Sequence, residues 1–265
     1  VQWQMSVVVG SDTEEFVGSE WLDRQAGLVR WATASPGEPQ ERWDAVWIKV
    51  GSKTWSHPGT FDIARYYPLD QGNDWRYGQR GQWWEEYLVL PPTTVGRYTD
   101  VRPLKFWESQ HDPSQDYDVH YHKIDADAFR FVAYRPSDFP QILLLREPAP
   151  SWPRPWVIGQ CVRSESAFVA GQLQAPYVQV AIPVAGGLRV DTPAGSFDQC
   201  VRIVGLRLID ARSVGEGIIW EHEDIIYAPD VGPVVRQYRG KEDNAYWGPG
   251  QLFWARVNGR EYGTK

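Results

Sequence analysis

Two histidines separated by one residue give the clearest pattern for metal chemistry in this chain, His120-Tyr121-His122. Side chains two positions apart on a strand point to the same side, so both imidazoles could reach one ion. We therefore predict His120 and His122 as a candidate metal site. The alternative is a solvated strand edge that carries two histidines, because no third ligand lies at a motif-like spacing.

Carboxylates beside aromatic rings form the second pattern that could do chemistry. Strand alternation within the segment WWEEY at 83–87 puts Trp83, Glu85 and Tyr87 on one face. Trp84 and Glu86 then lie on the opposite face. A glycoside hydrolase needs two carboxylates at a set separation beside aromatic subsites, but the sequence gives no pairing. The carboxylates available for such a pair are Glu85, Glu86, Glu108 and Asp118.

Two further acidic segments are less specific. In the segment EHED at 221–224, Glu221 and Glu223 share one face, and we interpret the segment as an exposed strand face. The aspartates between 112 and 127 could offer oxygen ligands to Ca²⁺, but they lack the spacing of a calcium-binding loop. The sequence has no serine-nucleophile elbow, phosphate-binding glycine loop or Cys-His-Asn set at a known spacing. We therefore expect no enzyme activity and no cofactor.

Length and charge limit the classes of protein that remain. The chain has 265 residues, enough for one large β domain or two small ones. Its formal net charge is −7, so the basic face that a nucleic-acid-binding protein needs is not expected. No apolar run approaches the length of a membrane-spanning helix. The chain begins at Val1, which we interpret as a mature, processed end or a trimmed one.

Aromatic residues are unusually frequent, with 15 Trp and 13 Tyr beside a single Met. Large rings fill a β core well, and exposed rings serve as platforms for a sugar or a protein partner. We expect both uses, with most rings in the core. The candidate interface or ligand residues are Trp3, Trp83, Trp84, Trp107, Trp247 and Trp254.

The two cysteines, Cys161 and Cys200, allow a single disulfide pairing. Each lies in a strand-like segment, so the strands could bring them together. A bridge would indicate an oxidising compartment. The alternative is two unrelated buried thiols, because spacing alone gives no geometry.

The strand and turn signals indicate an antiparallel all-β protein. Short segments with alternating apolar and polar residues recur along the chain, and the connections between them are rich in Gly and Pro. No convincing long helix is predicted. The segment 147–156 holds four prolines and must be an extended connection. Near the end, Asn258-Gly259 is the dipeptide that favours a type I′ hairpin turn.

Three motifs resemble those of a group of bacterial exported proteins and lipoproteins, mostly uncharacterised. PLDQGNDWRY at 68–77 resembles their PLxxGxxWxY opening, and PAGSFDQCVRI at 193–203 resembles their PAG(T/S)F element. YAPDVGPV at 227–234 resembles their closing YAPGVG-type motif, with Asp230 where Gly is usual. Order and spacing match from about 66 to 239, and the flanking segments are not covered.

This resemblance implies a strongly curved antiparallel sheet, a half-barrel or a sandwich with few short helices. The shape would be related to bacterial outer-membrane lipoprotein carriers, whose concave face can hold an apolar ligand, a helix or another protein. The motifs are turn and strand-end residues, so they imply no catalytic role. We expect a Trp-rich β region at 1–65, the curved sheet at 66–240, and a tail with a hairpin at 241–265.

The function hypothesis that follows is a non-enzymatic binding or scaffold protein in the periplasm or outside the cell. It would be an accessory subunit docked on a membrane protein complex, with a protein partner at the membrane surface. One alternative is a carbohydrate-binding or carbohydrate-active β protein. Another is a carrier of a lipid or other apolar ligand held in the concave sheet.

Overall fold

A computed structural model of the chain has two compact units, Val1–Gly59 and Thr60–Lys265. In the first unit it describes Gly59 and the backbone of six strands. In the second it describes residues 60–78, 84–108, 114, 117–137, 139, 141–149, 151–171, 173–210, 218–240 and 250–264. Among these residues no helix is long and apolar enough to cross a membrane.

The first unit is an open antiparallel sheet with a separate hairpin. Its strands are β1 (Gln2–Val9), β2 (Asp12–Asp23), β3 (Gly27–Ala34), β4 (Glu41–Asp44), β5 (Ile48–Val50) and β6 (Lys53–Trp55). β1 to β4 pair in chain order, and β5 pairs with β6.

The second unit is almost entirely β, as the sequence predicted. Its elements are β7 (Thr60–Phe61), α1 (Ile63–Tyr66), β8 (Asp74–Gly78), β9 (Trp84–Val89), β10 (Thr93–Val95), β11 (Tyr98–Glu108), β12 (Asp118–Ile124), β13 (Ala128–Arg135), β14 (Leu143–Leu145), β15 (Ser151–Pro153), β16 (Trp156–Val157), β17 (Val162–Ala170), β18 (Leu173–Thr192), β19 (Gly195–Asp210), β20 (Ile218–Ala228), β21 (Gly232–Gly240), β22 (Gly250–Val257) and β23 (Arg260–Gly263).

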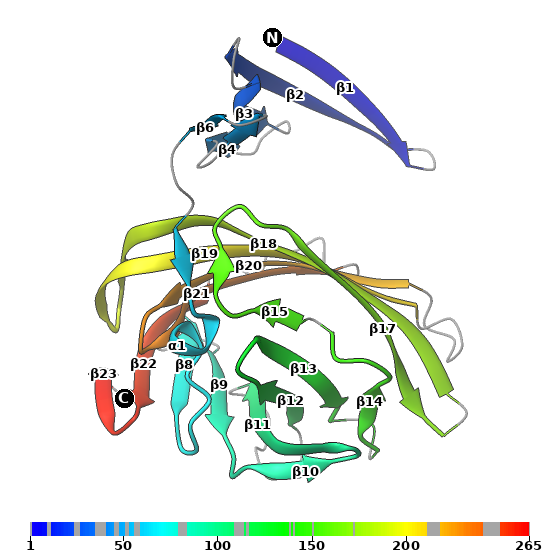
Figure 1. Ribbon diagram of the computed structural model, residues 1–265, viewed down its shortest axis with the longest axis vertical. Coiled ribbons are helices and arrows are strands. Elements are labelled where there is room, and N and C mark those ends of the chain that lie inside the picture. The colour runs from blue at the N-terminus through cyan, green and yellow to red at the C-terminus, as the bar shows by residue number, and fades with distance from the viewer. Residues whose placement is uncertain are drawn as a thin grey trace. The chain divides into compact units, whose positions relative to one another are not determined.

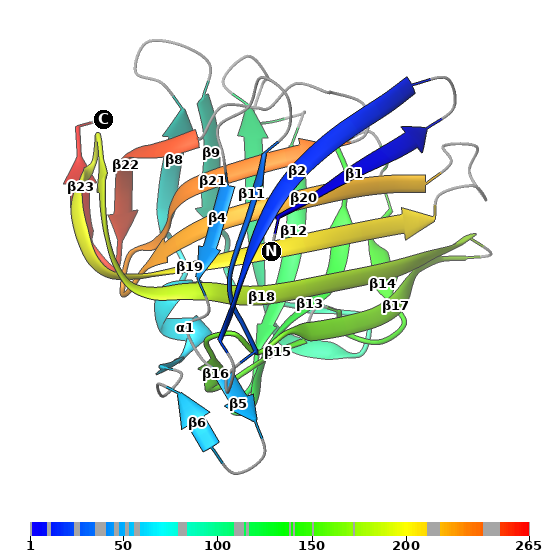
Figure 2. The same ribbon diagram turned by 90° about the horizontal axis from the view of Figure 1, so that it is seen from above.

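The sheet of the second unit closes on itself, which corrects the expected half-barrel or sandwich. Among the described strands, twelve form an antiparallel ring in the order β11-β12-β13-β14-β17-β18-β19-β20-β21-β22-β8-β9, and β9 returns to β11. The closing step pairs Leu104 with Val89 and continues to Glu108 opposite Glu85. The long strands β17 to β21 run side by side across one side of this ring (Figures 1 and 2).

The resemblance motifs meet at one end of the ring and hold it shut. The indole Nε1 of Trp75 donates a hydrogen bond to the Val231 carbonyl at 2.6 Å, and the Tyr77 hydroxyl donates to the Pro233 carbonyl at 2.9 Å. Both aromatic side chains come from β8; the Val231 carbonyl lies in the turn between β20 and β21, and the Pro233 carbonyl lies at the start of β21. The first motif therefore packs directly on the third.

The remaining motif belongs to the same end. The backbone N–H of Ala194 donates to the Leu252 carbonyl of β22 at 3.0 Å. Phe197 is buried and its ring lies 5.9 Å from that of Tyr262 on β23. The segment 250–264, expected as a tail with a hairpin, thus contributes β22 to the ring itself. Its turn, Asn258-Gly259, has two positive φ angles, as a type I′ turn requires.

Cys161 and Cys200 are free thiols, so the proposed disulfide is wrong. Cys161 precedes β17, whose Val162 pairs with Ala181, whereas Cys200 on β19 pairs with Leu188. Across the sheet, the strand β18 therefore lies between the two cysteines. Along the strand direction, they are also several residues apart. At about 3.3 Å per residue and 4.8 Å per strand, their separation far exceeds the ~7 Å limit for a disulfide between Cα atoms.

Gly232 is a position at this end of the ring where a side chain would clash with a buried ring. It has a φ of +110°, and a Cβ there would lie 2.9 Å from the Trp75 Nε1. We predict that Gly232→Ala lowers the free energy of unfolding by about 3 kcal/mol or more, because the methyl group displaces the buried indole. Urea denaturation followed by tryptophan fluorescence measures this change.

Gly72→Ala is the matched control for the backbone strain alone. Gly72 has a φ of +87°, but an added Cβ would meet no heavy atom within 4 Å. Its expected cost is about 1–2 kcal/mol, the strain of a left-handed conformation in an L residue. Equal losses in the two variants would contradict a specific role for the contact between Gly232 and Trp75.

Candidate functional site

The interior of the ring holds a cavity of about 430 Å³, which reaches Tyr77 of the first motif and Tyr227 and Pro233 of the third. Inward-facing side chains of β8, β9, β11–β13 and β17–β21 line it, because alternate residues of each strand point into the ring. The described lining residues are Tyr67, Tyr77, Glu85, Tyr87, Phe106, Glu108, Asp118, His120, His122, Phe129, Phe131, Tyr134, Trp152, Phe168, Tyr177, Gln179, Arg207, Ile209, Glu221, Glu223, Ile225, Tyr227, Pro233, Arg236 and Gly250.

Aromatic rings form most of the cavity wall. Tyr87 and Phe106 stack with ring centroids 5.2 Å apart, and Tyr67 and Phe129 stack at 5.6 Å. Burial raises the pKa of Tyr67 to about 12, so its hydroxyl stays neutral at physiological pH. The wall is thus a set of ring faces and edges that favours flat organic groups or cations.

Arg207 on β19 carries one buried positive charge of the cavity. Its guanidinium pairs with Glu221, and lies 3.2 Å from the Oε1 of Glu223. Burial alone would lower the pKa of Arg207, but the fields of Glu221 and Glu223 outweigh burial and raise it well above its usual value. The sequence interpretation of 221–224 as an exposed face is therefore wrong for these two glutamates, although their shared face was predicted correctly.

Arg236 on β21 carries the other described positive charge. Its guanidinium carbon lies 3.9 Å from the centroid of the Tyr87 ring and 5.3 Å from that of Tyr77. The Nη1 atom lies 3.9 Å from the Oε2 of Glu85. The rings of this wall therefore already hold one cation over their faces.

Five carboxylates and two guanidinium groups line the described cavity, which leaves three formal negative charges in excess. Glu108 and Asp118 are the two acids on the wall formed by β11 and β12. Asp118 lies directly opposite Phe106 in the pairing of these strands. Its Oδ1 accepts a hydrogen bond from the Ser137 backbone N–H at 2.6 Å.

His120 and His122 both face the cavity, as the alternation predicted, but they do not lie on a solvated edge. β12 is paired on both sides, with β11 and β13. Burial lowers the pKa of His122 to about 3, and burial together with the charge of Arg207 lowers that of His120 well below its usual value. Both imidazoles are therefore neutral at physiological pH.

The two imidazoles lie 6.1 Å apart between ring centroids, in an edge-to-face arrangement among Phe106, Phe131 and Tyr134. Within the described residues no group of three or more His, Cys, Asp or Glu side chains could hold a metal ion. His122 is 8 % exposed, and neither its Nδ1 nor its Nε2 has a hydrogen-bond partner among the described residues. An unsatisfied, deeply buried imidazole is therefore part of the cavity wall.

The remaining sequence candidates lie outside the cavity or outside the described residues. Glu86 points away from the interior and pairs with Arg76 at 2.7 Å. Trp107 is half-buried, with the Lys105 Nζ 5.2 Å from its ring centroid. Trp254 is 2 % exposed and so offers no surface to a partner. The side chains of Trp3, Trp83, Trp84 and Trp247 lie outside the described residues.

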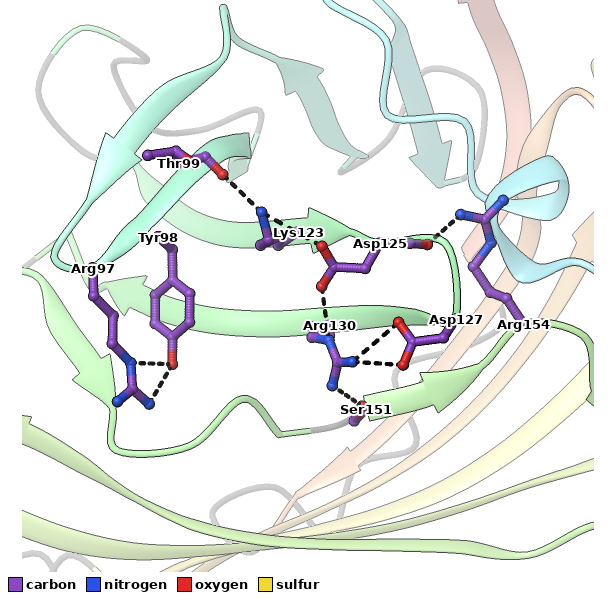
Figure 3. A network of polar contacts seen from close by, with 9 residues as sticks. All are labelled: Arg97, Tyr98, Thr99, Lys123, Asp125, Asp127, Arg130, Ser151 and Arg154. Carbon is purple, nitrogen blue, oxygen red and sulfur yellow. Dashed lines mark hydrogen bonds and ion pairs between the residues drawn. The ribbon is translucent and has the colours of Figure 1, made fainter.

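Two of the aspartates considered for calcium, Asp125 and Asp127, are engaged by cations. Asp125 accepts a hydrogen bond from the Arg130 Nε at 2.9 Å and lies 3.5 Å from the Lys123 Nζ. Asp127 also pairs with Arg130, at 3.2 Å. Figure 3 shows these side chains around the turn between β12 and β13, at the opposite end of β12 from Asp118. Their carboxylates support the turn.

Comparisons with known proteins give two distant structural likenesses. No family model and no curated protein matches the chain. A lipoprotein candidate from Parabacteroides distasonis is 14 % identical, covers 71 % of this chain and 96 % of its own, and has a TM-score of 0.39. A candidate exported protein with a YmcC-like fold from Bacteroides fragilis is 12 % identical, covers 77 % and 99 %, and has a TM-score of 0.37. At these identities and TM-scores, neither structure supports an argument about a ligand or an activity of this chain.

Sequence reasoning missed the two arginines of the cavity. Arg207 and Arg236 each lie in a strand with alternating residue types, where a charged residue is normally predicted to face solvent. The alternation of the strand could have indicated this. Arg207 is on the same strand face as Val201, Ile203 and Gly205, and all three of these residues are buried.

The unprotonated state of His122 makes the stability of the fold depend on pH. The unfolded chain binds a proton to this imidazole below about pH 6.5, whereas the folded protein does so only near pH 3. One such group lowers the free energy of unfolding by about 1.4 kcal/mol for each pH unit below about 6.5. In His122→Phe this contribution is absent.

We predict that between pH 7.5 and pH 5 wild type loses about 2 kcal/mol more stability than His122→Phe. Urea denaturation of both proteins at the two pH values measures the difference, and His120 is common to both. An identical pH dependence in the two proteins would show that His122 is protonated or solvated in the folded state.

Proposed function

We propose that this protein binds a small organic molecule inside its closed sheet and holds it without transforming it. The observation that carries the proposal is the cavity of about 430 Å³, lined by aromatic rings and a few charged groups. Ligand cavities of ordinary size fall between about 300 and 1,000 Å³ and combine apolar walls with a few placed polar groups.

The energetics of the lining support a bound molecule. His122 has no described hydrogen-bond partner, and a buried polar group without one costs about 1–3 kcal/mol. The excess negative charge of the described lining adds to this cost, because like charges in a space walled by protein repel more strongly than in bulk water. A ligand that meets these groups would recover that free energy.

The carbohydrate alternative keeps part of its support, since stacked rings and carboxylates also serve sugars. Of the carboxylates considered for it, Glu85, Glu108 and Asp118 line the cavity and Glu86 does not. The apolar-ligand alternative is less favoured, because seven formally charged side chains line the same space. Both are outcomes that the ligand experiment below distinguishes.

We predict that Ile209→Trp abolishes ligand binding, because the indole fills the cavity from its β19 wall. Native mass spectrometry of protein purified from its own source should show a bound mass, which the variant lacks. Leu208→Trp is the matched control: Leu208 is the next residue of the same strand, faces outward and is 36 % exposed. Loss of the bound mass in both variants, or its retention in Ile209→Trp, would place the ligand elsewhere.

A protein partner outside the cytoplasm is the second candidate function, as the motif resemblance implies. One observation favours it: the outer face of β18 and β19 is apolar, with Leu206 at 40 % and Leu208 at 36 % exposed. Val180 and Val178 lie opposite these two leucines on β18. We propose that this face docks on a membrane protein in the periplasm or at the cell surface.

This docking proposal predicts that mild-detergent extracts of the native membrane contain the protein in a complex with one defined membrane protein. Leu206→Glu with Leu208→Glu should release it from that complex while the cavity still binds its ligand. A monodisperse, partner-free wild-type protein in such extracts would contradict the proposal.

A further inference from the structure

Two side chains of the cavity wall, His122 and Trp152, carry hydrogen-bonding groups that have no partner among the described residues. Resting on the proposed function, we propose that the bound molecule is an uncharged, flat aromatic compound with a hydrogen-bonding group at each of two ends. A hydroxyl at one end meets His122, and a carbonyl oxygen at the other end meets Trp152.

Both side chains are deeply buried. His122 is 8 % exposed, and neither of its ring nitrogens is hydrogen-bonded within the described residues. Trp152 is 7 % exposed, and its Nε1 is in the same condition. Since most buried polar groups in folded proteins have a partner, two exceptions on the wall of one cavity need a reason. A ligand that bonds to both groups supplies it.

The two groups lie on either side of one phenyl ring. His122 is on β12, and its ring centroid is 5.2 Å from that of Phe129 on β13. Trp152 is opposite Phe129 in the pairing of β15 with β13, and their rings stack with centroids 5.7 Å apart. Because both polar groups adjoin the same ring, a single benzene ring with a substituent at each end can bridge them.

The chemistry of each group decides which end of the ligand it meets. An indole N–H only donates, so Trp152 requires an acceptor such as a carbonyl oxygen. This N–H lies in the plane of its ring, so it points away from Phe129 and Trp156, the rings stacked on the indole. The neutral imidazole of His122 has one nitrogen that accepts, and a ligand hydroxyl can donate to it.

The nitrogens themselves are covered by neighbouring atoms, so binding requires ring side chains of the wall to shift. Changes of side-chain conformation over a nearly fixed backbone are common at binding sites. Here β12 and β13 are each paired on both sides, which holds their backbone in place while the rings adjust.

The carboxylates of the lining do not select the ligand, because the protein already engages them. All five have an interaction within the described structure: Glu85, Glu108, Asp118, Glu221 and Glu223. None of them is therefore left over as the partner of a ligand cation. Their excess of formal negative charge over the two arginines still disfavours an anionic ligand.

The surroundings of His122 also disfavour a cation. Burial lowers the pKa of this imidazole to about 3, so the wall around it does not stabilise even the imidazole's own positive charge. A charged group of the ligand beside His122 would lose its hydration in the same way. A neutral hydroxyl loses far less hydration, and its hydrogen bond to the imidazole offsets that loss.

Probes that differ by one group test the inference by isothermal titration calorimetry. 4-Hydroxyacetophenone carries both the hydroxyl and the carbonyl, acetophenone lacks the hydroxyl, and 4-ethylphenol lacks the carbonyl. We expect 4-hydroxyacetophenone to bind about tenfold more tightly than either of the others, the effect of one buried hydrogen bond. Tyramine and 4-hydroxybenzoate carry a charged group at the carbonyl end and should bind more weakly than 4-hydroxyacetophenone by about thirtyfold or more.

Two variants assign the two ends of the ligand. His122→Phe should remove the preference for 4-hydroxyacetophenone over acetophenone and keep the preference over 4-ethylphenol. Trp152→Phe should do the reverse. Trp156→Phe is the matched control, because Trp156 stacks on Trp152 but its Nε1 already donates to the Gln160 carbonyl at 3.0 Å. Both preferences should remain in this control.

The outcomes separate this inference from the function on which it rests. Equal binding of the three neutral probes overturns the inference, and so does a charged probe that binds as tightly as 4-hydroxyacetophenone. A preference that survives the variant expected to remove it, or that is lost equally in Trp156→Phe, also overturns it. So does a protein that retains a bound mass sensitive to Ile209→Trp but binds none of the neutral probes. Only a protein with no bound mass and no probe binding overturns both.

Discussion

The hydrogen bonds of Trp75 and Tyr77 to the start of β21 are the interaction on which the rest of the structure depends. β8 lies between β22 and β9 in the ring, and β9 makes the closing pairing with β11. By tying β8 to the carbonyls of Val231 and Pro233, these two buried side chains fix the strand on which the closing strand β9 pairs. The indole approaches so closely that only a glycine fits at position 232.

Closure divides the interior into two halves of different chemistry. In one half the inward side chains are apolar and packed, with Leu252, Val234 and Ile63 fully buried. Farther along the same strands they become aromatic and charged, and the packing leaves a cavity. A column of stacked rings joins the halves: Trp156 packs on Trp152, which packs on Phe129. The apolar half thus supports the wall of the cavity.

Patterns among neighbouring residues predicted more of the structure than could be inferred about the pairing of distant strands. Period-two alternation placed Glu85 with Tyr87, Glu221 with Glu223, and the two histidines on common faces, and each pair faces the cavity. The four-proline segment is extended and contributes only the short strands β15 and β16, outside the ring. Which face is inward could not be predicted, because that depends on pairing between distant strands.

The closure of the sheet also could not be predicted from the sequence, because it depends on pairing between distant strands. The pairing of β9 with both β8 and β11 follows from register, and no motif at 84–89 signals a second partner. The cysteines misled because sequence spacing says nothing of the strand that lies between them. The negative potential of the cavity appears only when acids from strands β9, β11, β12 and β20 converge on one volume.

A ring in which every strand has two neighbours changes how the second unit can meet another macromolecule. Each of the twelve described strands has a neighbour on both sides for at least part of its length, so an incoming chain finds little vacant backbone along the ring to extend the sheet. The shortest junctions, β14 with β17 and β21 with β22, are each two residue pairs long. The first unit differs, since its described sheet ends in β1 and β4, and each has a neighbour on one side only. Strand addition is therefore open to β1 and β4 of the first unit and, in the second unit, to short strands outside the ring such as β10 and β23, each of which has one described neighbour.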